Sequence, residues 1–163
     1  MERNNSPLRY QIPGASWCLE FPESVVLQLA AYAQWGSRSL EGVGQLYTRD
    51  LTASSVTVDC VTKVAPAWAK YTAVRLDMKA VKQERAAMFK KGLHCIGFWH
   101  SHPESRPHVS PTDLIMAEEQ ARAGKSDYQG LVFMIIGNVP PPNGFGVWVH
   151  DGDKLWRADS IPG

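Results

Sequence analysis

Two histidines, a serine and an aspartate lie close together in the chain and could do chemistry at one site. His100 and His102 flank a single serine, and Ser110 and Asp113 follow shortly after them. Two imidazoles and one carboxylate are three ligands of the kind that catalytic zinc takes, with its fourth position left open. Zinc in such a site lowers the pKa of a bound water to about 7, which favours attack on a carbonyl carbon. The spacing therefore predicts a hydrolytic metal site made by His100, His102 and Asp113.

Hydrolysis needs two further groups beside the metal. One must carry a proton from the water to the leaving amine, and another must donate a hydrogen bond to the developing oxyanion. Ser110 stands beside Asp113 in the sequence and could be the oxyanion donor. The segment itself offers no evident general base, because Glu104 lies in the loop after the histidines with no clear reason to face the metal.

The elements expected around these residues place them at the ends of a strand and a helix. The apolar run Leu93 to Trp99 predicts a buried strand that ends at the histidines. Because His100 and His102 are two positions apart in an extended chain, their imidazoles point to the same face. Ser110 at the N-cap and Asp113 at N3 predict a helix start, and Gly124 marks its end. Ser110 can cap the helix and still face the site. Asp113 cannot fully serve as both a capping residue and a metal ligand, and we expect it to bind the metal.

The rest of the chain predicts an α/β (α+β) domain, with a mixed central sheet and about three helices. We expect one domain over residues 1–163, with its core at about 17–150. The glycines at 42 and 44 allow another backbone to come close to their strand. The other expected strands are Trp17 to Phe21, Leu40 to Thr48, Val56 to Val64 and Leu131 to Ile136. One further helix is expected to begin at Pro22, and another to run from Asp77 to about Lys91, where Gly92 stops it. A terminal hairpin is expected from Phe145 to His150 and Lys154 to Ala158.

Composition excludes several classes of partner. The formal net charge is +1, and the densest basic stretch, Lys82 to Lys91, is typical of a solvated helix face, so we expect no nucleic-acid partner. No apolar run reaches the ~18 residues of a membrane span, and residues 1–10 lack the apolar segment of a signal peptide. The cysteines, at 18, 60 and 95, are odd in number and far apart, which favours reduced thiols in a cytoplasmic protein.

The spacing of the polar residues resembles the motif of a known family. His-x-His, seven residues, Ser110, two residues and Asp113 match the JAMM (JAB1/MPN/Mov34) zinc metalloprotease motif position for position. The family also carries a glutamate before a glycine-rich strand, and Glu41 to Leu46 reads Glu-Gly-Val-Gly-Gln-Leu. The resemblance implies a cytidine-deaminase-like JAB/MPN fold, with one catalytic zinc ion on the two histidines and Asp113. It also implies that Glu41 is the general acid/base.

The same resemblance implies a substrate. The family hydrolyses peptide or isopeptide bonds after the C-terminal residue of ubiquitin or ubiquitin-like proteins, whose tail pairs with the sheet. The chain is most similar to stand-alone bacterial members, some of which stand in CBASS-type or BIL-type antiphage operons beside activating and conjugating enzymes. Three alternatives remain: a peptidase that processes sulfur-carrier proteins, a non-cleaving tail-binding module with a structural zinc, and a related domain of DNA repair. A structural zinc usually has four protein ligands, and no fourth is evident here.

Other conspicuous side chains are expected to have ordinary roles. Ser101 points away from the metal and is expected to be structural, while Trp99 belongs to the core. His108 is expected to be a solvated loop histidine, like the unremarkable strand histidines at 94 and 150. The loop Ala65 to Tyr71 carries two large aromatics, which either pack on the domain or contact the substrate tail.

Overall fold

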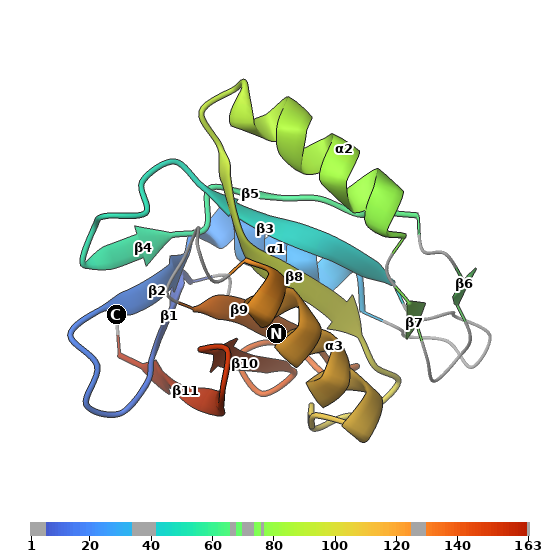
Figure 1. The fold of residues 1–163 in the computed structure, drawn as a ribbon. Coiled ribbons are helices and arrows are strands. Elements are labelled where there is room, and N and C mark those ends of the chain that lie inside the picture. The colour runs from blue at the N-terminus through green and yellow to red at the C-terminus, as the bar shows by residue number, and fades with distance from the viewer. Residues whose placement is uncertain are drawn as a thin grey trace.

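The computed structural model describes residues 6–33, 42–65, 68–69, 74–75, 77–124 and 130–162. Three helices and eleven strands lie along these ranges (Figure 1). No helix within them is long and apolar enough to cross a membrane. The helices are α1 (Glu23–Ala31), α2 (Met78–Phe89) and α3 (Pro111–Ala123). The strands are β1 (Leu8–Gln11), β2 (Cys18–Phe21), β3 (Val43–Thr48), β4 (Ser55–Thr57), β5 (Cys60–Val61), β6 (Trp68–Ala69), β7 (Val74–Arg75), β8 (His94–Ser101), β9 (Leu131–Ile136), β10 (Phe145–His150) and β11 (Leu155–Ile161).

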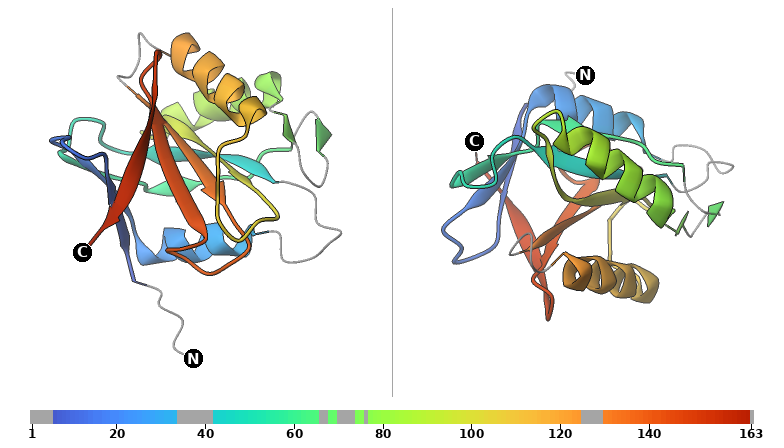
Figure 2. Two further views of the ribbon diagram at one scale, coloured as in Figure 1. Left: turned by 90° about the horizontal axis from the view of Figure 1, so that it is seen from below. Right: turned by 45° about the horizontal axis from the view of Figure 1, so that its top comes forward.

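Nine strands form one mixed sheet, in the order β4-β2-β1-β11-β10-β9-β8-β3-β5. Neighbours in it are antiparallel except at two places, where β8 runs parallel to β9 and β2 runs parallel to β4. The sheet is strongly curled, with α1 on one side and α3 on the other (Figure 2). The predicted α+β class, with a mixed sheet and three helices, is confirmed for the described residues.

The helices cover opposite faces of the strand that carries the histidines. Leu29 of α1 belongs to the same buried cluster as Trp99 of β8. Ala117 of α3 instead packs in a cluster with Phe98, the next residue along β8 toward the N-terminus. Successive side chains of a strand point to opposite faces, so His100 shares the face of Phe98 and looks toward α3.

The segment Val56 to Val64 is not the single strand that its β-branched residues predicted. Its first part, β4, pairs with β2 at one edge of the sheet, and its second part, β5, pairs with β3 at the other edge. The crossing occurs between two consecutive residues. The amide of Val58 donates to the carbonyl oxygen of Glu20 at 2.8 Å, and the amide of Asp59 donates to that of Tyr47 at 2.9 Å. The curl of the sheet brings its two edges so close that one peptide link bridges them.

Local sequence signals set most of the other boundaries. The Asp77 side chain accepts hydrogen bonds from the amides of Lys79 and Ala80 and caps α2, as predicted. Gly92, with φ of +78°, ends the turn after that helix, and Gly152, with φ of +101°, lies in the turn between β10 and β11. The predicted terminal hairpin is confirmed.

Two features were not predicted. The polar N-terminal segment contains β1, which pairs with both β2 and β11. The stretch Ala65 to Tyr71, predicted as a loop, contains β6, which pairs antiparallel with β7 in a separate two-stranded sheet. Strands this short leave little periodicity for a sequence pattern to detect.

Candidate metal centre

Three buried side chains converge at the C-terminal end of β8. Nε2 of His100 lies 3.1 Å from Oδ1 of Asp113, and Nε2 of His102 lies 3.2 Å from Oδ2. The two Nε2 atoms are 2.7 Å apart. The exposed fraction is 0% for His100, 5% for His102 and 6% for Asp113. Among the described residues, this is the group of histidine, cysteine and acidic side chains that could hold a metal ion.

Strand geometry places the two histidines. His100 lies in β8 between β3 and β9, opposite Val43 and Ile135. The backbone amide of His102 donates to the carbonyl oxygen of Ile136 at 2.9 Å, which keeps the chain extended beyond the end of the strand. The two rings therefore stack, with centroids 4.6 Å apart and planes 3° apart. Phe133 of β9 meets the ring of His100 edge-on at 5.0 Å and closes the apolar side of the site.

The N-terminus of α3 places the carboxylate. The amide of Asp113 donates to Oγ of Ser110 at 3.1 Å, and the amide of Ser110 donates to Oδ2 of Asp113 at 2.9 Å, which makes a capping box. The Asp113 carboxylate completes the capping box and also faces both histidines, so capping does not turn it away from them. Its Oδ2 takes part in the box and also faces His102, while Oδ1 is left for His100.

The same box leaves Ser110 able to donate. Its oxygen accepts the amide hydrogen of Asp113, and a serine hydroxyl has one further proton to give. Ser110 is partly exposed, whereas the carboxylate next to it is buried. The structure thus brings Ser110, His100, His102 and Asp113 into one place.

Burial and hydrogen bonding set the charges of the group. Burial lowers the pKa of His100, and the hydrogen bond and charge of Asp113 only partly oppose it. Burial alone would raise the pKa of Asp113, but hydrogen bonds from His100 and His102 outweigh it and hold this pKa well below its usual range. The favoured state is thus a neutral imidazole at position 100 beside an ionised carboxylate. These are the protonation states in which imidazole and carboxylate bind metal.

The donor set fits a catalytic zinc ion. It offers two imidazole nitrogens and one carboxylate, close enough to meet at one ion, and three protein ligands are what catalytic zinc takes. Nδ1 of His100 is buried and has no hydrogen-bond partner in the described structure. Metal-bound histidines usually donate from their second nitrogen, so this ring is held by packing against Phe133 instead.

Glu41, the expected general base, lies outside the described residues. Its neighbour Gly42 is described and is bound to β8 between the two histidines. The amide of Gly42 donates to Oγ of Ser101 at 2.8 Å, and the amide of Ser101 donates to the carbonyl oxygen of Gly42 at 3.0 Å. Ser101 thus has a structural contact on the face away from His100, as predicted.

The two glycines near this contact differ in what they require. A Cβ at Gly44 would lie 1.7 Å from the carbonyl oxygen of Thr62, so the close backbone approach predicted there is confirmed. A Cβ at Gly42 would meet only ordinary contacts of 3.5 Å or more, chiefly with the ring of Trp99. The prediction of a close backbone approach is therefore right for the first glycine and wrong for the second.

The remaining candidates have the ordinary roles that were expected. His108 is exposed and pairs with Glu104 at 2.6 Å, and its ring meets that of His102 edge-on, with centroids 6.2 Å apart. Trp99 is fully buried and donates from Nε1 to the carbonyl oxygen of Thr62 at 2.8 Å. Phe133 was not predicted as part of the site. Its strand was predicted, but the register that sets it against His100 arises only in the folded sheet.

Comparison with known proteins gives a family match over most of the chain. Residues 22–151 match the family described as prokaryotic homologs of the JAB domain. A segment of 96 residues is 30% identical to a protein of Enterobacter hormaechei subsp. hoffmannii (strain UCI 50) named CD-NTase/cGAS isopeptidase. That match covers 58% of this chain and 52% of the relative, so the chain spans about half the length of the curated relative it matches.

Solved structures share the fold. A protein of Desulfitobacterium hafniense superposes with a TM-score of 0.61 at 18% identity, over 86% of this chain and 88% of that one. A protein of Salinibacter ruber gives a TM-score of 0.53 at 20% identity, over 88% and 90% of the two chains. At these identities, the likeness extends to the fold alone.

Proposed function

Because the chain belongs to the family of prokaryotic homologs of the JAB domain, we propose that it is a zinc-dependent isopeptidase or peptidase. It cleaves the bond after the C-terminal residue of a ubiquitin-like modifier. The observation that carries the proposal is the meeting of three buried donors, on His100, His102 and Asp113, at one point. Three donors leave room for a reacting molecule, whereas a structural zinc usually takes four, which argues against a non-cleaving module.

Two histidines and Asp113 would hold the ion. Bound there, zinc lowers the pKa of a water molecule to about 7 and polarises a carbonyl. The protein's part is to fix this donor set, and it does so through β8 and the capping box of α3. The burial of all three side chains excludes bulk water from the ligands.

Glu41 and Ser110 would do the proton and oxyanion work. The water oxygen bonds to the carbonyl carbon while its proton passes to the Glu41 carboxylate. The C–N bond then breaks as the same proton moves to the leaving amine. The Ser110 hydroxyl donates to the oxyanion formed in between. Support for Glu41 comes from its place in the chain next to Gly42, which is hydrogen-bonded to Ser101 between the two ligands.

A cavity of about 550 Å³ beside Ser110 supports the binding of a substrate chain there. Val109, Leu114 and Leu155 give it apolar walls, and Lys154 is among its polar residues. Leu114 is 40% exposed although it follows Asp113 directly. An extended tail that reaches the metal group can place an apolar side chain in this cavity.

The relative's name favours an isopeptide bond and a defence role. The Enterobacter protein is named CD-NTase/cGAS isopeptidase. By this likeness we infer that the chain acts in a cytoplasmic ubiquitination-like antiphage pathway of bacteria. Its partners are then the tail of the modifier, its conjugates, and operon-encoded activating and conjugating enzymes. Maturation of a sulfur-carrier protein is the competing substrate.

The decisive experiment is a cleavage assay with two substrates, a ubiquitin-like modifier fused to a reporter and the same modifier linked to a lysine side chain. Zinc-loaded protein is expected to release the intact modifier, and chelator-treated protein to release none until zinc is restored. Glu41→Gln is expected to keep about one zinc per chain and to lower kcat at least about 100-fold. Glu23→Gln is the matched control, because that carboxylate is exposed in the first turn of α1 and is not part of the metal group. Full activity after metal removal would refute the proposal.

A further inference from the structure

The indole of Trp99 supports the backbone at Gly42 from the side of the sheet that is turned away from the metal group. Side chains alternate along β8, so Trp99 points toward α1, whereas His100 points toward α3. A Cβ added at Gly42 would lie 3.5 Å from Cη2 and from Cζ3 of the indole, so the space between the two holds no more than a methyl group. Trp99 is fully buried, and the hydrogen bond from its Nε1 to the carbonyl oxygen of Thr62 fixes the ring.

Tyr32, the C-cap residue of α1, stacks on the same indole. The ring centroids of Tyr32 and Trp99 are 4.6 Å apart, and the ring planes are 3° apart. Two further contacts hold the tyrosine. Its hydroxyl accepts a hydrogen bond from Nε2 of Gln28 at 3.1 Å, and Nζ of Lys63 lies 5.9 Å from the centroid of its ring. These contacts fix the orientation of the ring, whereas packing alone would require only an apolar side chain at this position.

Tyr32 and Gly42 stand at the two ends of the connection from α1 to β3, and Glu41 belongs to that connection. Gly42 follows Glu41 directly, and successive Cα atoms are about 3.8 Å apart, so fixing Gly42 limits where Glu41 can lie. The indole of Trp99 and two hydrogen bonds with Ser101 fix Gly42. Tyr32 in turn holds the indole, so one buried ring anchors both ends of the connection.

We propose that Tyr32 and Trp99 are positioning residues for Glu41, which they hold in place by stacking beneath Gly42. The inference rests on the proposed function, in which Glu41 is the general base. Such a base must lie within hydrogen-bond reach of the proton that it takes, and a displacement of about 1 Å can lower a rate about 100-fold. Neither aromatic ring belongs to the metal group, because Trp99 and Tyr32 pack in the cluster on the α1 side of β8.

A double-mutant cycle tests whether Tyr32 acts through Glu41. Cleavage of the modifier–reporter fusion is measured for the zinc-loaded native protein, Tyr32→Leu, Glu41→Gln and the double variant. Tyr32→Leu is expected to lower kcat about 3- to 10-fold, the range that corresponds to the loss of an aromatic pair, with KM and zinc content unchanged. Tyr32→Phe keeps the stacked ring and is expected to restore most of the lost kcat. In the Glu41→Gln protein, Tyr32→Leu is expected to lower the residual kcat less than about 2-fold, because the group through which it acts is already gone.

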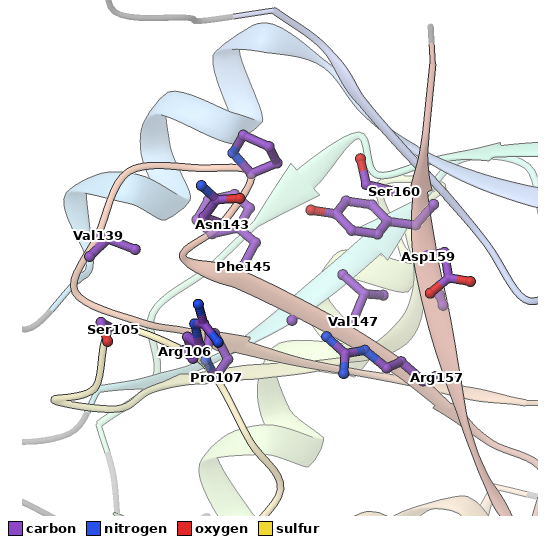
Figure 3. Close-up of a pocket in the computed structure, with 14 residues that line it drawn as sticks. Ser105, Arg106, Pro107, Val139, Asn143, Phe145, Val147, Arg157, Asp159 and Ser160 are labelled. Carbon is purple, nitrogen blue, oxygen red and sulfur yellow. The ribbon is translucent and has the colours of Figure 1, made fainter.

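Tyr10→Leu is the matched control, because it makes the same substitution elsewhere against the same buried cluster. Tyr10 meets Phe21 edge-on and lines a separate cavity of about 710 Å³ between β10 and β11 (Figure 3). The fully buried tyrosine is expected to cost at least as much Tm as Tyr32→Leu, while kcat measured well below both Tm values stays unchanged. A fall in kcat that matched that of Tyr32→Leu would show that loss of stability alone explains both and would overturn the inference.

The inference also fails if Tyr32→Leu leaves kcat unchanged, or if it lowers kcat equally with and without the Glu41 carboxylate. Either result would leave the proposed function standing, because Glu41→Gln would still be the inactive variant. Full activity of Glu41→Gln would instead refute the proposed base, and the positioning role would fall with it.

Discussion

Ser101 and Gly42 are joined by two hydrogen bonds, one in each direction. Oγ of Ser101 accepts the amide of Gly42 at 2.8 Å, and the carbonyl oxygen of Gly42 accepts the amide of Ser101 at 3.0 Å. Ser101 stands between the two histidines in the chain, and Gly42 follows Glu41. The pair therefore ties the segment that carries the proposed base to the strand that carries the proposed ligands.

Ser101→Ala is expected to weaken the positioning of the proposed base, Glu41, while leaving zinc binding intact. One of the two hydrogen bonds disappears, which lowers the free energy of unfolding by about 1 kcal/mol. Because Glu41 is then held less firmly, kcat is expected to fall about 3- to 10-fold, which corresponds to a rise in the activation free energy similar to the energy of the lost hydrogen bond. Zinc is expected to stay near one per chain. Elemental analysis measures the zinc content, and cleavage kinetics measure kcat. Ser54→Ala, at an exposed turn, is the control, and loss of zinc in Ser101→Ala would contradict the assignment.

Asp113→Asn is expected to separate capping from metal binding. Asparagine can still accept the amide of Ser110, so the metal-free protein loses no more than about 1 kcal/mol of unfolding free energy. The negative charge is lost, and zinc affinity falls at least about 10-fold. Denaturant titration and competition with a chromogenic chelator measure the two effects. Asp77→Asn changes the N-cap carboxylate of α2 and is expected to leave zinc affinity intact, so an equal loss in both variants would sink the prediction.

The metal-free protein is expected to lose stability as the pH falls below about 6.5. Burial lowers the pKa of His100 in the folded state. In that range the unfolded chain takes up a proton at this histidine and the folded protein does not, so protons favour unfolding. Tm measured from pH 7 to pH 5 should fall. His100→Gln should flatten the slope, and a slope that survives this change would point to another group.

Glu84→Ala is expected to loosen α2 from the sheet. One oxygen of Glu84 accepts hydrogen bonds from Gln45 at 3.0 Å, from the Tyr47 hydroxyl at 2.8 Å, and from the hydroxyl of Thr62. Gln45 and Tyr47 are fully buried, so the loss of their acceptor costs about 2–4 kcal/mol of unfolding free energy. Glu118→Ala, which removes an exposed pair with Arg122, should cost under about 0.5 kcal/mol. Equal effects in denaturant titrations would disprove the role of the Glu84 contacts.

The metal group could be predicted from the sequence because its parts are local. The histidines lie two residues apart at the end of an apolar strand, and Ser110 and Asp113 carry the signature of a helix start. Local signals also predicted α2, with its Asp77 cap, and the hairpin of β10 and β11.

The unpredicted parts depend on contacts between distant segments. The division of Val56 to Val64 into two strands follows from the curl of the sheet, which no local pattern encodes. Phe133 meets His100 only through the register of β9 on β8. The contacts of Asp113 with both Ser110 and the histidines depend on which oxygen faces which partner, and residue types alone do not determine that.

Val58 and Asp59, which link the two edges of the sheet, lie inside the segment that matches the family, but the sheet itself extends beyond that segment. The family match begins after β2 and ends before β11. A chain trimmed to residues 22–151 would lack three strands that stand together in the sheet, between β4 and β10. It would expose both of those strands as open edges, which favour aggregation, and would lose Tyr10, Leu19 and Phe21 from the core. The residues proposed to perform the chemistry lie inside the matched segment, while the sheet that holds them includes strands outside it.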